Sequence, residues 1–348
     1  MPISINKYNP AIDLLRFISI LAVILIHTVT RTLEVTGYIL DQTPMAFILH
    51  QIFRFAVPLF FMISGFVLEL NHDNHASYWQ YLKKRLSKIF VPYVFWSAIY
   101  FYFIYTQHGP DFISALIYGS ASHQLYFIPA ILIFYLVFPL FHKLYKILAN
   151  KWVLIIFGLV QLYLLYADHY LHSVHLFYPI GVGLYNFYVC IIGMKASHHH
   201  DEIIAWVKKN LCLLSAITLS LAVILILTAR IMYSKTGDIG YFYSNWRPQV
   251  LLYTLAFAAL FYYLLSKIKI NLQLIKELSG LSFLVFFIHI IVLEQVWRLW
   301  ASPLFVATNN QVGQTLWYDP AFFLIVTTLS FLGAYALHQF PYLKKLTG

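Results

Sequence analysis

The sequence predicts an all-α integral membrane protein with about ten transmembrane helices. Of its 348 residues, 61% are hydrophobic and only 10% are charged, whereas a soluble domain carries about a quarter charged residues. Ten apolar windows approach the roughly 20 residues that a helix needs to cross a bilayer. The basic residues are concentrated in alternate loops, as described below. Together these observations exclude an ordinary soluble protein.

The ten apolar windows follow one another along the chain with short connections. They cover residues 11–32, 44–68, 89–106, 123–142, 151–168, 177–196, 210–232, 248–266, 280–301 and 319–339. The first follows Asn9 and Pro10, a pair typical of a helix N-terminus. The polar stretch 71–88 is compatible with a short amphipathic helix at the inner surface. No connection is long enough for a soluble domain, so we expect residues 1–348 to form a single polytopic membrane domain with no appended soluble domain.

The positions of Lys and Arg orient these helices. If the N-terminus is cytoplasmic, 16 of the 23 basic residues fall in segments that are then cytoplasmic, and five fall in outer segments. This is a positive-inside bias, so we expect both termini to be cytoplasmic, in a multi-pass protein of the plasma or inner membrane. Because the basic residues are spread over short loops, the net charge of +10 does not indicate nucleic-acid binding.

The chain shows no convincing metal or redox site. Cys190 and Cys212 lie in apolar stretches and lack the spacing of a disulfide framework or a metal site. His198, His199 and His200 stand in a predicted cytoplasmic loop without partners at ligand spacing, so we interpret them as a solvated loop. No metal is expected.

Charged residues inside the first two windows are the strongest evidence for a functional site, because a charge in mid-membrane costs about 2.5 to 3.5 kcal/mol on insertion scales. Arg16 and His27 are 11 residues apart, so they share one helix face and lie about 16 Å apart along the axis. Asp13, three residues before Arg16, offers a simpler account, a local ion pair. Arg54 lies about as deep as His27 and could bind an anion or a carbonyl, or it could pair with Glu294 or a backbone carbonyl.

These residues belong to a wider pattern that resembles the acyltransferase 3 family of membrane O-acyltransferases. The first helix of that family carries Arg or Lys, ten residues, and then His, as Arg16 and His27 do here. Four further stretches agree, with Tyr126 in place of the usual Trp: Arg54 with Val57-Pro58-Leu59-Phe60-Phe61-Met62-Ile63-Ser64-Gly65-Phe66, Arg85-Leu86-Ser87-Lys88 with Pro92-Tyr93, His123-Gln124-Leu125-Tyr126-Phe127-Ile128-Pro129, and Leu281-Ser282-Phe283 through Ile288-His289.

The resemblance implies transfer of an acyl group, commonly acetyl, from cytoplasmic acyl-coenzyme A to a hydroxyl of a glycan on the outer side. It also implies a role for Ser64, His123 and His289 in substrate binding. His289 could alternatively be a second catalytic histidine or a hydrogen-bonded core residue. Glu294, five residues later, is about 140° away around the same helix and is expected to point elsewhere. Family members often carry a fused extracellular hydrolase-like domain, whereas this chain stops at Gly348. If the reaction needs the activity of that domain, a separate glycan synthesis or transferase protein is an expected partner.

The residue chemistry fits this expectation. A hydroxyl is a poor nucleophile at neutral pH, and imidazole, with a pKa of about 6.5, is a suitable general base, which makes His27 the candidate. Arg16 stays protonated and could hold a phosphate or a thioester carbonyl. Transient acylation of His27 remains an alternative to general-base catalysis.

Arg85 and Lys88 are expected to bind coenzyme A phosphates, although topology alone would also explain them. Lys88 stands where the family often has a second Arg, and Lys lacks the bidentate geometry of Arg.

Two other classes of function compete with an acyltransferase. A polysaccharide transporter or flippase also needs a polar route through the bilayer, although the spans contain few acids and no repeated half. A sensor or scaffold that has kept the fold without activity would leave Arg16 and His27 replaceable.

Overall fold

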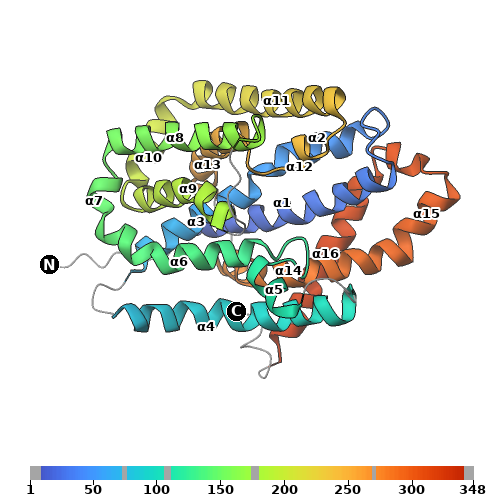
Figure 1. Ribbon diagram of the computed structural model, residues 1–348, viewed down its shortest axis with the longest axis horizontal. Helices are drawn as coiled ribbons and strands as arrows, with labels where there is room; N and C mark the ends of the chain where they lie inside the picture. The colour runs from blue at the N-terminus through green and yellow to red at the C-terminus, as the bar shows by residue number, and fades with distance from the viewer. Residues whose placement is uncertain (1–8, 73–76, 106–110, 174–179, 269–271, 341–348) are drawn as a thin grey trace.

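The computed structural model describes residues 9–72, 77–105, 111–173, 180–268 and 272–340, and every regular element in these ranges is helical (Figure 1). In the first half of the chain the helices are α1 (Pro10–Val35), α2 (Pro44–Ile52), η1 (Phe53–Phe55), α3 (Ala56–Leu70), α4 (Tyr78–Ile99), η2 (Tyr100–Ile104), α5 (Phe112–Tyr118), α6 (Phe127–Lys143), α7 (Tyr145–Leu148) and α8 (Lys151–His169). In the second half they are α9 (Ile180–His198), α10 (His200–Lys209), α11 (Leu211–Thr236), α12 (Gly240–Tyr243), α13 (Pro248–Ser266), α14 (Leu272–Val296), η3 (Trp297–Ala301), α15 (Ser302–Ala307), η4 (Gln311–Gln314) and α16 (Tyr318–His338).

The protein is an all-α, multi-pass integral membrane protein. Eight helical segments in the described ranges are long and apolar enough to cross a bilayer: Pro10–Val35, Pro44–Leu70, Tyr78–Ile104, Lys151–His169, Leu211–Thr236, Gly240–Ser266, Gln273–Ala307 and Tyr318–His338. The two remaining apolar windows coincide with α6, a shorter apolar helix, and with α9. Each of the ten windows therefore falls on a helix, while the number that cross the membrane stays a prediction.

Two local predictions from the sequence have clear outcomes. The Asn9 side chain accepts hydrogen bonds from the backbone N–H groups of Ala11 and Ile12 at the start of α1, so the predicted N-cap is confirmed. The stretch 71–88 does not form a short helix of its own in its described part, and its residues 73–76 lie outside the described residues. Helix α4 begins at Tyr78 behind a Ser77 capping box and continues without a break into the apolar segment that follows, because no residue in its first half interrupts the helix.

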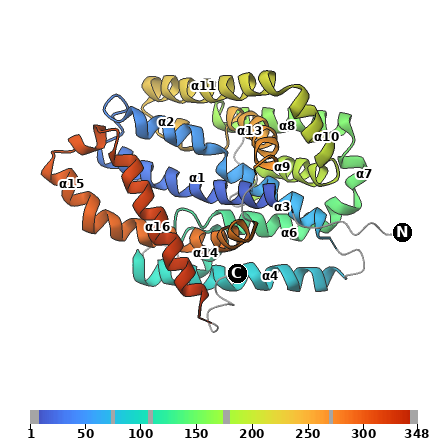
Figure 2. The same cartoon turned by 180° about the vertical axis from the view of Figure 1, so that it is seen from behind.

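Helix α1 lies inside the bundle and organises the elements that carry the site. It packs against α14, α16, α3, α13 and α2 (Figures 1 and 2). Most of its residues are buried, including Ser19, Thr28 and Thr32. A polar residue on such a helix faces protein rather than lipid, which is what makes the charges of α1 tolerable.

Glycines allow α3 and α9 to approach each other closely. A Cβ atom on Gly65 would lie 2.1 Å from the carbonyl oxygen of Cys190, and one on Gly193 would lie 2.0 Å from the carbonyl oxygen of Met62. Small residues at such crossings let helix backbones touch in membranes. The contact fixes α3, which lies between two of the cavities described below.

Candidate active site

Arg16 and His27 line two different cavities at successive levels of α1. The first cavity has a volume of about 280 Å³ and is lined by Arg16 together with Ser64, Arg85, Lys88 and Ser282. The second has a volume of about 150 Å³ and is lined by His27 together with Thr30, Arg31, His123 and Glu294. The 11-residue spacing that put both side chains on one face of α1 thus gives one helix a polar residue in each cavity.

The first cavity gathers three basic side chains from two helices. Arg85 and Lys88 are three residues apart on α4, and Arg16 comes from α1. Arg16 Nη1 lies 2.7 Å from Asp13 Oδ1 and 3.1 Å from Ser279 Oγ. The local ion pair considered from the sequence is therefore present. Among the described residues these contacts engage only one of the guanidinium nitrogens, so Arg16 keeps donors for an anionic or carbonyl ligand.

The wall of the first cavity is otherwise apolar with a few hydroxyl groups. Ser64 lines it from α3, and its Oγ donates a hydrogen bond of 2.8 Å to the carbonyl oxygen of Phe60. Ser282 lines it from α14. A cavity with basic groups at its edge and apolar walls suits a ligand that carries both phosphate and an aliphatic arm.

Two histidines meet beside the second cavity. The ring centroids of His27 and His289 are 5.3 Å apart with the ring planes at 48°. His289 is fully buried, and its Nδ1 lies 3.1 Å from the carbonyl oxygen of Val285. This contact assigns the proton to Nδ1, because a carbonyl can only accept. Nε2 of His289 is then an acceptor, and among the described residues it is buried without a partner.

An ion pair lies beside His27 at the other side of this cavity. Arg31 pairs with Glu294 and, at 3.3 Å, with Glu34, and its guanidinium carbon lies 5.5 Å from the ring centre of Trp297. The helical angle between His289 and Glu294 suggested that Glu294 faces away from the site. That expectation is wrong, because Glu294 lines the same cavity as His27. It lies about 1.4 turns after His289 on α14 and pairs with Arg31, about one turn beyond His27 on α1.

Arg54 lies in a separate buried network. It is 4% exposed, bonds to His50 and, through Nη1, to Asn245 Oδ1 at 3.0 Å. Its suggested pairing with Glu294 is therefore wrong, since Glu294 is held by Arg31. Arg54 lines neither cavity, but it lies within electrostatic range of His27.

Arg247 is one of the five basic residues that the sequence places in outer segments, and its burial was not predicted. It is 1% exposed at the start of α13, where Nη2 donates a 2.7 Å hydrogen bond to Gln51 Oε1. The sequence held one signal, the Pro248 that follows it, because proline at the first turn marks a helix start. Nothing in the sequence indicated that the neighbouring elements would cover the guanidinium.

The histidine run 198–200 is not simply a solvated loop. His198 is the last residue of α9, and its Nε2 lies 2.9 Å from Oε1 of Glu69, whose side chain is 2% exposed. His142 Nδ1, from α6, lies 3.0 Å from the other oxygen of Glu69. The prediction failed because Glu69, the residue that follows the second apolar window, was not considered as a partner. In the part of the chain that the structure describes, no group of three or more His, Cys, Asp or Glu residues is arranged to hold a metal ion.

The structure thus groups the residues predicted from the sequence into two sets. Arg16, Ser64, Arg85 and Lys88 line the first cavity, while His27 and His123 line the second, with His289 beside His27. Arg54 stands apart. Ionisable residues gathered around cavities on one buried membrane helix are typical of a functional site.

Comparison with known proteins identifies the family. Residues 9–339 match the family model Acyl_transf_3, described as an acyltransferase domain. The chain belongs to the acyltransferase 3 family.

Relatives are similar at low identity. The chain is 26% identical over 299 residues to a putative membrane-bound acyltransferase, YfiQ, of Bacillus subtilis (strain 168), an alignment that covers 80% of this chain and 79% of that protein. It is 23% identical over 329 residues to a probable poly-beta-1,6-N-acetyl-D-glucosamine export protein of Staphylococcus epidermidis, covering 89% of this chain and 85% of that protein. No solved structure gives a significant match.

Proposed function

We propose that this protein transfers an acyl group, acetyl in the simplest case, from cytoplasmic acyl-coenzyme A to a hydroxyl of a cell-surface polysaccharide. The observation that carries the proposal is the pair of cavities on α1, one basic and one lined by histidine. The positive-inside bias favours a cytoplasmic N-terminus. The Arg16 cavity then faces the side where acyl-coenzyme A is made, and the His27 cavity faces the side where the polysaccharide lies.

We assign the acyl donor to the first cavity because that cavity is lined by basic residues and the donor carries phosphate groups. Coenzyme A carries phosphate groups at one end and a thioester at the end of a long flexible arm. Arg85 and Lys88 stand at the N-terminal half of α4, where they can pair with phosphate, while Arg16 lies across the cavity on α1. Guanidinium groups suit phosphate and carbonyl oxygens, so Arg16 would hold an amide carbonyl of the arm, and the thioester end would extend about 16 Å along α1 to reach His27.

In the second cavity His27 acts as the general base. Its ring nitrogen takes the proton of the acceptor hydroxyl as the oxygen attacks the thioester carbonyl carbon. The new ester C–O bond forms and the C–S bond breaks. The coenzyme A thiolate leaves and takes the proton back from the imidazolium, so the histidine returns to its starting state. A two-step route through an acyl-histidine would use the same residue.

His289 is assigned as a positioning residue for His27. Its Nδ1 is held by the carbonyl of Val285, so Nε2 presents a lone pair in the buried space beside the His27 ring. A hydrogen bond from one His27 nitrogen to this lone pair would leave the other nitrogen unprotonated and free to act as base. The arrangement corresponds to the third group of a catalytic triad, which fixes a tautomer rather than reacting.

Mass spectrometry of surface polysaccharide tests the proposal. Cells carrying the wild type, His27→Ala, and no copy of the gene are compared. We expect a labile ester on the polysaccharide in the wild type alone, with the mass increment naming the acyl group. The proposal is wrong if all three polysaccharides carry the same substituents.

A polysaccharide export function is the second candidate, favoured by the name of the Staphylococcus epidermidis relative. The same cells distinguish it. Export predicts that the amount of surface polysaccharide falls when the gene is lost and that His27→Ala leaves it unchanged, with no ester in any strain.

A further inference from the structure

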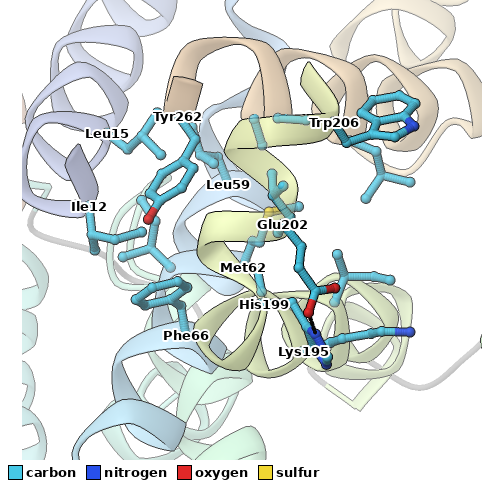
Figure 3. Close-up of a pocket in the computed structure, with 18 of the residues that line it drawn as sticks. Ile12, Leu15, Leu59, Met62, Phe66, Lys195, His199, Glu202, Trp206 and Tyr262 are labelled. Carbon is cyan, nitrogen blue, oxygen red and sulfur yellow. Dashed lines mark ion pairs between the residues drawn. The ribbon is translucent and has the colours of Figure 1, made fainter. Parts of the chain in front are cut away.

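A third cavity, about 950 Å³ in volume, is larger than the two cavities of the candidate active site (Figure 3). It lies among α1, α3, α9, α10 and α13. Most of its lining is apolar, as shown by Ile12, Leu15, Leu59, Phe66, Ala258 and Ala259. Its volume is at the upper end of the roughly 300 to 1,000 Å³ of small-molecule sites.

This cavity is distinct from the proposed donor site. Helix α3 stands between them, with Ile63 contributing to both walls. Arg16, Arg85 and Lys88 line the donor cavity and do not line the large one. The reaction proposed above therefore leaves this space without a role.

Three ionisable groups of the cavity, Lys195, His199 and Glu202, gather at one edge, as Figure 3 shows. Lys195 Nζ donates a 2.9 Å hydrogen bond to the carbonyl oxygen of Ala149. His199 Nδ1 lies 3.1 Å from Oε1 of Glu202, whose side chain is 79% exposed. Among the described residues no carboxylate lies within ion-pair distance of Lys195. Its ammonium group thus has a net charge and two donors for a ligand at the edge of an apolar space.

The edge lies at the level expected for the inner membrane interface. Helix α10, which carries Glu202 and Trp206, ends in Lys208 and Lys209. Trp206 lines the cavity and is 55% exposed. A short helix with two lysines in its last turn and an exposed tryptophan is typical of the membrane surface. The connection between α9 and α11 is also cytoplasmic by the positive-inside bias.

We propose that this cavity holds an acyl chain of an anionic glycerophospholipid from the cytoplasmic leaflet, with the lipid phosphate on Lys195. Water in the apolar part would find few polar partners, because the hydroxyl of Tyr262 is already bonded to Asn9. Inside the bilayer, the molecules available to fill an apolar space are lipid acyl chains. Basic pockets between transmembrane helices on the cytoplasmic side are typical sites for anionic headgroups.

A lipid in this position would support the start of α1. The chain would pack against Ile12 and Leu15, one on each side of Asp13, whose carboxylate holds Arg16. It would also fill the space between α13 and the α3–α9 pair. The lipid is thus a structural component next to the donor cavity, and the inference does not depend on the identity of the transferred group.

Native mass spectrometry of the purified full-length protein tests the inference. Delipidated protein is titrated with phosphatidylglycerol or phosphatidylcholine of the same chain composition. We expect a single tightly held phosphatidylglycerol, bound several-fold more tightly than phosphatidylcholine. Lys195→Ala should weaken this binding about fivefold, the effect of one basic residue at an anionic membrane surface. Ala259→Phe, which places an aromatic ring in the cavity, should weaken the binding of both lipids.

Two matched variants serve as controls. Lys209→Ala removes an exposed lysine of α10 that does not line the cavity, and Leu252→Phe enlarges an exposed side chain of α13; both should bind lipid like the wild type. Equal binding of the two lipids by the wild type, or unchanged binding by Ala259→Phe, would overturn the inference. Displacement of the lipid by palmitoyl-coenzyme A at equal concentration would also overturn it, because the cavity would then belong to the donor.

Discussion

Replacing His289 by leucine tests the positioning role that we assign to this residue. The change removes the buried Nε2 acceptor beside His27 while keeping an apolar side chain of similar length. The carbonyl of Val285 is four residues earlier in the same helix, so it keeps its backbone partner. The group that loses an acceptor is the His27 N–H, which lines the second cavity. We therefore expect His289→Leu to fold.

The magnitude follows from the contact that is lost. A neutral hydrogen bond contributes about 0.5 to 1.5 kcal/mol, so losing control of the His27 tautomer should lower kcat up to about tenfold with little change in KM. Loss of the base itself in His27→Ala should lower kcat by about 10² to 10⁴.

The assay is transfer of labelled acetyl from acetyl-coenzyme A to polysaccharide by purified protein in lipid nanodiscs. A double variant decides the mechanism: if His289 acts only through His27, the double variant should have the activity of His27→Ala alone. Wild-type kcat in His289→Leu, or effects that multiply in the double variant, would refute the positioning role.

Three further predictions test the donor site and the packing. Arg85→Ala should raise KM for acetyl-coenzyme A about tenfold or more, since hydrogen bonds to charged groups contribute about 1.5 to 3 kcal/mol. Arg85→Lys should recover part of the loss. An unchanged KM in steady-state kinetics would remove Arg85 from the donor site. Glu69→Gln should lower the free energy of unfolding by about 1 to 3 kcal/mol, detected as a lower melting temperature, whereas Glu202→Gln at an exposed position should not. Gly193→Val should abolish folding by separating α3 from α9, and Gly280→Val, where a Cβ meets nothing within 4 Å, should yield folded protein in size-exclusion chromatography.

The architecture was largely predictable because membrane helices can be recognised in a sequence by their length and apolar composition. Each of the ten apolar windows falls on a helix, since the bilayer forces every backbone group to bond within its own helix. The shared face of Arg16 and His27 followed from helical periodicity alone. Their placement in separate cavities did not, because a cavity depends on which neighbouring helices pack there.

Contacts between residues of different helices could not be predicted from the sequence. Glu294 was assigned the wrong direction because its angle to His289 was measured on one helix, while its partner Arg31 comes from another. Glu69 and Arg247 were passed over because both lie in connections between the predicted helices, where a charged residue needs no buried partner. Packing brought each of them to a buried partner.

The most direct test of the account is whether donor and acceptor act on opposite sides of the membrane. Sealed inside-out vesicles that contain the protein and enclose polysaccharide are given radiolabelled acetyl-coenzyme A in the external medium. The account predicts that label appears on the enclosed polysaccharide with the wild type and is lost with His27→Ala and with Arg16→Ala. Label that appears only after detergent opens the vesicles would place donor and acceptor on the same side and contradict the assignment of the two cavities.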